Sequence, residues 1–168
     1  MKWKLLQAIL LLPGMALFFI PLLVLYAASG TRFAHRVSVP SEPTLWAGIL
    51  IGAAGAALSA WTVVLFTRHG EGTPAPWSPP ARFVVRGPYR HVRNPMILGA
   101  ILMLVAESLI LRSLPLALWT IIFFAGNLLY FPLSEEKGLE RRFGESYRIY
   151  KANVPRWVPR LRPWVDTE

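Results

Sequence analysis

The sequence predicts an all-α, multi-pass membrane protein with about four transmembrane helices, and three observations support this fold class. Hydrophobic residues make up 54% of the 168 residues and charged residues only 16%, whereas soluble domains carry about 25% charged residues. The apolar residues are gathered into four long blocks, and the basic residues lie between and after them. Such an arrangement is typical of membrane proteins. We therefore expect residues 1–168 to form a single membrane-embedded domain.

The four apolar blocks are the expected membrane helices, at Leu5–Ala28, Leu45–Phe66, Met96–Leu111 and Leu114–Leu133. A helix needs about 20 residues to cross the hydrocarbon core, with about 17 as the lower limit. The first two blocks are long enough. The last two are short and separated only by Arg112-Ser113, so they predict a tight helical hairpin. A signal peptide is the alternative for the first block, but the length of its apolar run favours a retained helix.

The basic residues predict how the helices are oriented. If the chain crosses the membrane four times, 15 of the 18 Lys and Arg residues fall in the N-terminus, the second loop and the tail, which share one side. The positive-inside rule makes that side cytoplasmic, the inner face of the inner membrane in a bacterium. Both termini are then cytoplasmic, and the charge of +9 faces lipid head groups rather than nucleic acid. The chain has no cysteine and three scattered histidines, so we expect no metal site.

Residues 1–67 are expected to contain the first two transmembrane helices. The second of these helices carries small residues at near-helical spacing. They are Gly48, Gly52, Ala56 and Ser59. Small residues allow two helices to approach closely in lipid, where packing rather than the hydrophobic effect drives association. The stripe therefore predicts a helix-packing surface, with a groove for an alkyl chain as the alternative.

Two polar regions flank the hairpin of residues 96–133. Residues 68–95 are proline-rich, which predicts extended and turn geometry in a shaped cytoplasmic loop. Residues 134–168 form a cytoplasmic tail that begins with an amphipathic helix, bent near Gly144 and expected on the membrane surface. In the tail, Trp157 and Trp164 suit the head-group region.

A dense polar stretch stands directly before the third block, with the sequence VRGPYRHVRNPM (residues 85–96). Two helices of about 17 residues each cross and return over about 25 Å, so Asn94 and Glu135 are expected on the same membrane face. Asn127, Phe131 and Glu135 form one stripe of the fourth helix, which the loop residues Tyr89, Arg90, Arg93 and Asn94 are expected to face. The residues leave two interpretations open: a cofactor site, or carboxylates that only neutralise the arginines.

Three motifs occur in order. They are GPYRHVRNPMILG, an apolar hairpin, and SEEKGLERRFGESYRIYKANVPRWVPR. Over roughly residues 70–162 the chain resembles the isoprenylcysteine carboxyl methyltransferase and phospholipid methyltransferase family. The resemblance implies an integral membrane enzyme that uses S-adenosylmethionine. It also implies a lipidic or hydrophobic methyl acceptor, which is a prenylcysteine carboxylate, a phospholipid amine or a thiol. The alternative is a non-enzymatic transport or assembly protein that keeps the fold. The oligomeric state stays open.

The resemblance assigns roles to individual residues. The expected cofactor-binding residues are Tyr89, Arg90, Asn94, Pro95, Met96, Ile97, Glu135 and Glu136. Arg93 and Glu135 are expected to be catalytic, and Asn127 and Phe131 to contact the acceptor. Three positions depart from the family pattern: Asn94 replaces a usual His, Ile97 a usual Tyr, and Phe131 an Arg that is linked to substrate in the prenylcysteine enzymes. The last departure disfavours a prenylcysteine carboxylate as the acceptor.

Overall fold

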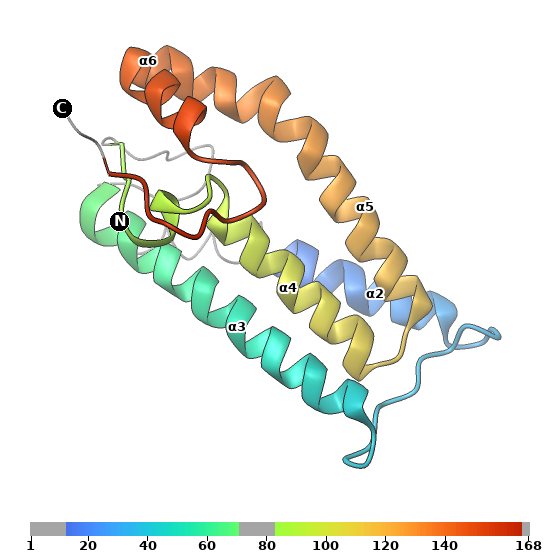
Figure 1. Ribbon diagram of the computed structural model, residues 1–168. Coiled ribbons are helices and arrows are strands. Elements are labelled where there is room, and N and C mark those ends of the chain that lie inside the picture. The colour runs from blue at the N-terminus through green and yellow to red at the C-terminus, as the bar shows by residue number, and fades with distance from the viewer. Residues whose placement is uncertain (1–12, 71–82, 166–168) are drawn as a thin grey trace.

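The computed structural model describes residues 13–70 and 83–165, and every regular element in those ranges is helical. Helices α3, α4 and α5 form an elongated bundle, with α2 beside it and α6 across one end (Figure 1). The elements are η1 (Met15–Phe19), α2 (Ile20–Ala28), α3 (Pro43–Leu65), η2 (Phe66–Gly70), η3 (Gly87–Arg90), α4 (Pro95–Ile110), α5 (Leu114–Tyr130), η4 (Phe131–Glu135) and α6 (Glu136–Asn153). The predicted all-α fold class is confirmed for these residues.

Two helical segments are long and apolar enough to cross a membrane, Pro43–His69 and Leu114–Asn153. The apolar part of the second segment ends near Leu133, after which charged residues begin. Two further helical segments, Met15–Ala28 and Pro95–Ile110, are apolar but shorter. The start of the first apolar block lies outside the described residues. Two spanning helices are therefore supported, and four crossings stay a prediction.

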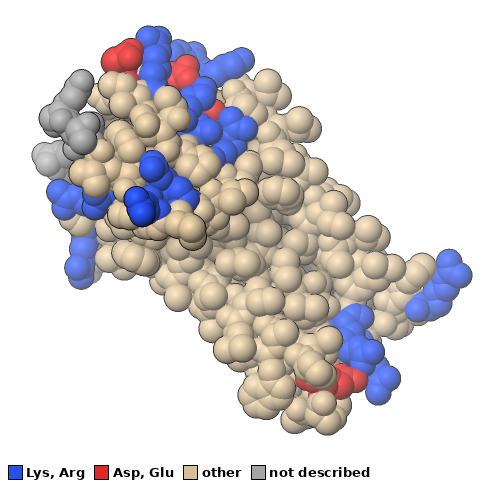
Figure 2. All heavy atoms as spheres, in the orientation of Figure 1, with Lys and Arg blue, Asp and Glu red and all other residues tan. Residues whose placement is uncertain are grey.

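On the face shown in Figure 2, charged side chains gather at the two ends of the bundle and the middle is uncharged. Large apolar side chains stand exposed along the helices, among them Leu22, Leu50, Ile121 and Leu129. A soluble monomer rarely exposes so much contiguous apolar surface. The uncharged belt is the surface that lipid would cover.

Helices α3 and α4 form the most extensive helix pair, and glycines bring them together. Gly48 and Gly55 are buried on α3. A methyl group added at Gly55 would lie 2.6 Å from the carbonyl oxygen of Gly99, and one added at Gly99 would lie 2.3 Å from Ser59 Oγ. The predicted small-residue stripe is thus a packing surface. It passes through Gly55 rather than Ala56, which is exposed, because one face of a helix recurs at spacings of three and four.

Proline and serine set the helix starts. Pro43, Pro95 and Pro115 stand in the first turns of α3, α4 and α5, where a missing backbone N–H costs nothing. At the turn between α4 and α5, the side chain of Ser113 accepts a hydrogen bond from the first turn of α5. The predicted hairpin with its turn at Arg112 and Ser113 is confirmed.

The helix continues from α5 into α6 without a break. Pro132 has no N–H to donate, and the helix accommodates it with the π-helical turn η4. The predicted bend near Gly144 is confirmed, because this residue has φ 56° and ψ −126° inside α6. Side chains with a Cβ rarely adopt such a backbone, so only glycine fits without strain.

Gly144→Ala is expected to lower the free energy of unfolding by about 1–3 kcal/mol. No atom lies within 4 Å of the added methyl group, so the cost is purely one of backbone conformation. Thermal unfolding of the detergent-solubilised protein measures it. Gly138→Ala is the control: it also meets open space, but its backbone is helical and alanine favours a helix by about 1 kcal/mol. Equal stability of the two variants would contradict the prediction.

The apolar face of α6 packs on the protein itself. Tyr147, Tyr150 and Val154 are buried together, and Phe83 packs its ring against both tyrosines at centroid distances of 5.7 and 5.1 Å. These apolar side chains are therefore buried in protein rather than in lipid, and the position of the helix at the membrane surface stays a prediction. The bend at Gly144 turns the second half of α6 back over residues 83–85 and the tail, which cover the aromatic side chains in place of lipid.

Candidate functional site

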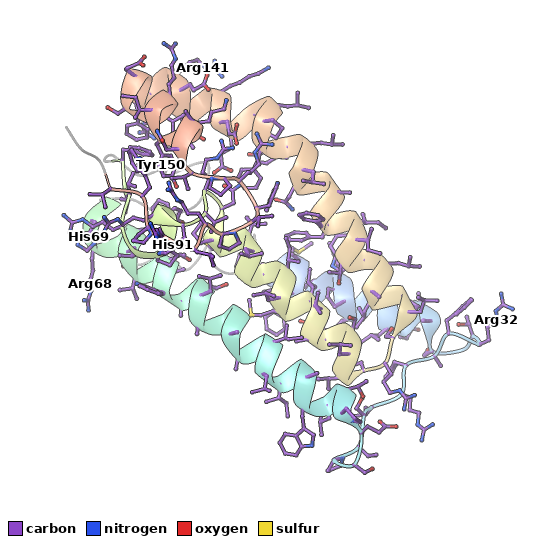
Figure 3. The ribbon with its side chains drawn as sticks, in the orientation of Figure 1. Arg32, Arg68, His69, His91, Arg141 and Tyr150 are labelled. Carbon is purple, nitrogen blue, oxygen red and sulfur yellow. The ribbon has the colours of Figure 1, made fainter. Side chains whose placement is uncertain are left out.

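The polar loop before α4 lies at the same end of the bundle as α6. Figure 3 shows His91 and Tyr150 close to this end, with Arg68 and Arg141 on its outer edges, and Arg32 at the opposite end. We call the region formed by residues 66–70, 83–95 and 135–165 the basic end; it includes the acidic pair, α6 and the tail. The loop and the acidic pair that the sequence predicts to meet are both found here.

Tyr89 is held inside the basic end. Gly87, with φ 53°, turns the chain into η3. The ring of Tyr89 then packs edge-on against Phe66 at 5.4 Å, and its carbonyl oxygen accepts a hydrogen bond of 2.7 Å from the Tyr150 hydroxyl. Burial raises the pKa of Tyr89, and the nearby Tyr150 and Glu135 groups raise it further. Tyr89 is thus a neutral phenol at physiological pH.

Glu136 is the centre of an ion cluster and is only 2% exposed. Its Oε1 accepts hydrogen bonds from Arg93 Nη1 at 2.8 Å and from Arg156 Nε at 2.6 Å, and its Oε2 accepts one from Arg156 Nη2 at 3.0 Å. Lys151 Nζ lies 3.3 Å from Oε2. Desolvation acts to raise the pKa of Glu136, but the hydrogen bonds and charges of these cations hold it below its usual value. The predicted meeting of the loop arginines with the acidic pair is confirmed by this contact.

Glu135 has different surroundings from its neighbour. Its side chain is exposed to solvent. Protein atoms nevertheless surround the carboxyl group and remove part of its hydration. This desolvation, together with the adjacent Glu136 carboxylate, raises the pKa of Glu135 to about 7. No ion pair to Glu135 is found among the described residues. A carboxylate in such a position is suited to bind a cationic group.

The remaining predicted site residues divide into two groups. Asn94 stands directly before α4, Pro95 is buried, and Met96 and Ile97 are partly buried in the first turn of that helix. These residues follow Arg93 at the start of α4, and their contacts with a cofactor stay a prediction. The other group does not face the loop as expected. Asn127 donates its amide to the carbonyl of Phe123 in its own helix at 2.7 Å.

Phe131 belongs to this second group and lies in an aromatic cluster. It is 5% exposed and packs edge-on against Trp157 at 5.6 Å and against Tyr130 at 5.8 Å. Trp157 also packs edge-on against Phe124 at 5.3 Å. Phe131 therefore meets the tail rather than the loop, because the tail covers the end of α5.

The tail after α6 is fastened to the loop by backbone hydrogen bonds. They are Arg93 N to Pro155 O (2.9 Å), Arg160 N to His91 O (2.9 Å) and Trp164 N to Arg90 O (2.8 Å). Side chains add two more: Arg90 Nε donates to Trp164 O at 2.7 Å and His91 Nδ1 to Arg160 O at 2.8 Å. The loop residue Arg90, predicted to bind cofactor, thus holds the tail in this structure.

Buried nitrogen atoms without a hydrogen-bond partner among the described residues gather at the basic end: the donors Arg93 Nε, Asn94 Nδ2 and Trp157 Nε1, and also His69 Nδ1 in η2. Buried polar groups are nearly always paired, so unpaired donors in neighbouring segments call for acceptor atoms from elsewhere. S-adenosylmethionine carries a carboxylate, ring nitrogens and hydroxyl oxygens, so this donor set fits it. Among residues 13–70 and 83–165, no group of three or more His, Asp or Glu side chains is placed to hold a metal ion.

A groove of about 430 Å³ lies beside the loop. Its lining comes from η3 and from Leu58 and Trp61 of α3, Leu98 of α4, and Pro159 and Pro163 of the tail. The volume is in the range of small-molecule sites, about 300–1,000 Å³. Its walls are mostly apolar, and it lies where the apolar helices meet the basic end.

Several residues of this region carry no assignment from sequence reasoning. Arg156, Lys151 and Tyr150 fasten Glu136 and Tyr89, and all three come from α6 or the tail. The available signal was the tail motif itself, in which arginine and proline alternate with tryptophan. Composition alone favours a membrane-surface role for such residues, so their inward contacts required the fold.

One of three comparisons with known proteins gives a match. The sequence profile described as phospholipid methyltransferase matches residues 43–146, about three fifths of the chain. No curated protein and no solved structure matches. The matched range contains α3, the loop, the α4–α5 hairpin and both glutamates of the acidic pair. The chain belongs to the phospholipid methyltransferase family, a family of membrane methyltransferases that act on lipids.

Proposed function

We propose that the protein transfers a methyl group from S-adenosylmethionine to a lipid at the basic end of the bundle. The observation that carries the proposal is the 2.8 Å contact between Arg93 of the loop and Glu136 of the acidic pair, where the apolar helices end. A cofactor site placed there lies at the boundary between the apolar helices and the basic end. The family match supports the reaction type.

The residues divide the work of holding the cofactor. Glu135, which has no cationic partner among the described residues, binds the amino group. Arg93 and Asn94 use their unpaired donors for the carboxylate or hydroxyl oxygens. Pro95, Met96 and Ile97 pack beneath it at the start of α4. Glu136 fixes Arg93 rather than binding the cofactor itself. S-adenosylmethionine supplies an activated methyl group, so the protein mainly orients the reactants and excludes water.

The acceptor is proposed to be a lipid without a carboxylate at the reacting end. The position that could pair with a carboxylate near the acidic pair holds Phe131, which is buried against Trp157. An amine or a thiol needs no cation there. The apolar groove beside Leu58 and Trp61 offers a wall for the hydrocarbon part of such a lipid.

The basic end is proposed to face the cytoplasm, with four crossings and both termini on that side. The positive-inside rule supports this orientation. In the structure, Arg68, Arg86 and Arg93 belong to the basic end, together with the basic residues of α6, whereas Arg32 stands at the opposite end.

Glu135→Gln is expected to weaken S-adenosylmethionine binding by about 10- to 100-fold, because a hydrogen bond between charged groups is lost. In the wild type the affinity should fall as pH drops below about 7, since Glu135 with its raised pKa then becomes protonated and neutral. The decrease should approach tenfold per pH unit. Glutamine cannot titrate, so the variant should lack this dependence. Binding of labelled cofactor between pH 5.5 and 8 measures both effects.

Glu145→Gln is the matched control, because this exposed glutamate of α6 makes only a 3.4 Å contact with Arg148. Unchanged binding in the control and weaker, pH-independent binding in Glu135→Gln support the site. Equal binding by wild type and Glu135→Gln would remove Glu135 from it. If folded wild type binds no cofactor at all, the non-enzymatic alternative takes precedence. With binding established, labelled methyl transfer to aminophospholipid and thiol acceptors tests the acceptor class.

A further inference from the structure

The indole N–H of Trp157 is a buried donor with no acceptor. The ring itself is fixed on two sides, edge-on against Phe124 at 5.3 Å and against Phe131 at 5.6 Å. Neither phenylalanine offers a hydrogen-bond acceptor. An unpaired buried N–H costs about 1–3 kcal/mol. The aromatic packing therefore holds the indole in a position where its N–H has no acceptor.

Trp157 belongs to the same structural unit as the two other unpaired donors. Arg93 donates its backbone N–H to the carbonyl of Pro155, two residues before Trp157. Arg156 lies between Pro155 and Trp157 and donates two hydrogen bonds to Glu136. Glu136 also accepts a hydrogen bond from the side chain of Arg93. Asn94 follows Arg93 directly. The donors of Arg93, Asn94 and Trp157 are therefore carried by two short segments that are bonded to each other.

We infer that the tail completes the cofactor site, with Trp157 as a further binding residue whose indole N–H donates to an acceptor atom of S-adenosylmethionine. The inference rests on the proposed function and goes beyond it. The loop and α5 supply one part of the site, and a segment after α6 supplies another. Binding of the cofactor then also stabilises the attachment of the tail to the loop, because the ligand contacts both.

Trp157→Phe tests the donor, because phenylalanine keeps an aromatic ring against Phe124 and Phe131 but has no N–H. The variant is expected to bind S-adenosylmethionine about tenfold more weakly than wild type, which corresponds to about 1.4 kcal/mol. The matched control is Trp164→Phe. This change removes an indole from the same tail, where Trp164 packs against Tyr150 at 5.8 Å, and Trp164 Nε1 is not among the unpaired buried donors. The control should bind as wild type does.

Hydrogen exchange gives a second readout that does not depend on turnover. The backbone N–H groups of Arg160 and Trp164 are bonded to the carbonyls of His91 and Arg90. In the wild-type protein, saturating S-adenosylmethionine should slow their exchange. In folded Trp157→Phe, the slowing should be smaller at equal cofactor concentration. Both proteins are compared in the same detergent, with thermal unfolding as the check on folding.

The outcomes separate the inference from the proposed function. Weaker binding by Trp157→Phe, normal binding by Trp164→Phe and slower tail exchange in the presence of cofactor support the inference. If Trp157→Phe binds the cofactor as tightly as wild type does, or if cofactor binding leaves hydrogen exchange in the tail unchanged, the inference is overturned and the proposed function stands. Absence of binding by folded wild type overturns the proposed function, and the inference with it.

Discussion

Glu136→Ala is expected to lower the free energy of unfolding by about 3–5 kcal/mol, the cost of removing one partner from a buried ion pair. The carboxylate receives three hydrogen bonds from Arg93 and Arg156 and lies near Lys151. Without it, Arg93, whose side chain is 10% exposed, stays buried with no counter-charge. The cluster also joins the loop, α6 and the tail, so its loss should loosen the whole basic end.

Thermal unfolding in detergent measures the effect, and Glu145→Ala is the control. Glu145 lies on the same helix with its side chain 72% exposed, and its contact with Arg148 is 3.4 Å long. An exposed ion pair contributes about 0–1 kcal/mol, so the control should unfold close to wild type. A loss at Glu136 no larger than that at Glu145 would mean that the ion cluster does not stabilise the basic end.

This cluster is the part of the site that the sequence predicts best. A hairpin of two helices of similar length must return to the membrane face from which it started. The distance along the chain between Arg93 and Glu136 therefore places them together before any packing is known. The structure brings these two side chains to 2.8 Å. The prediction depended only on helix rise and on the position of the turn at Arg112 and Ser113.

The direction of side chains within the site was less predictable. The expected stripe on the fourth helix holds only in part, because Asn127 bonds to its own helix and Phe131 packs against the tail. Periodicity states which residues share a face. It does not state what covers that face. Here the cover is Trp157, some 26 residues later in the chain, and no local pattern indicates that contact.

The apolar face of α6 illustrates the same limit. An amphipathic helix next to a membrane buries its apolar side either in lipid or in protein, and both choices leave the same sequence pattern. The positive φ of Gly144 decides between them. Once the helix bends there, Tyr147 and Tyr150 pack against Phe83. The sequence shows a glycine at this position, but it does not predict the sign of the glycine's φ angle or the direction of the bend.

Gly99→Ala is expected to lower the free energy of unfolding by about 1–3 kcal/mol, the usual cost of overfilling a packed interface. The added methyl group would lie 2.3 Å from Ser59 Oγ, 2.7 Å from the carbonyl oxygen of Gly55 and 3.1 Å from the backbone N of Ser59. The hydroxyl can rotate away, but the backbone atoms of α3 cannot. The two helices must therefore separate, and the loop that ends at the start of α4 must move with them.

Gly126→Ala in α5 is the matched control, because it also places a methyl group in a helix but meets no atom within 4 Å. Alanine favours a helix over glycine by about 1 kcal/mol, so this variant should be as stable as wild type or more stable. Both variants are compared by thermal unfolding in one detergent, and cofactor binding is measured on the folded protein. Because Asn94 and Pro95 stand one turn before Gly99, separation of α3 from α4 should weaken binding in Gly99→Ala and leave it unchanged in Gly126→Ala. Equal stability and equal binding of the two variants would show that α3 and α4 tolerate a wider spacing, and that the position of the loop does not depend on their close contact.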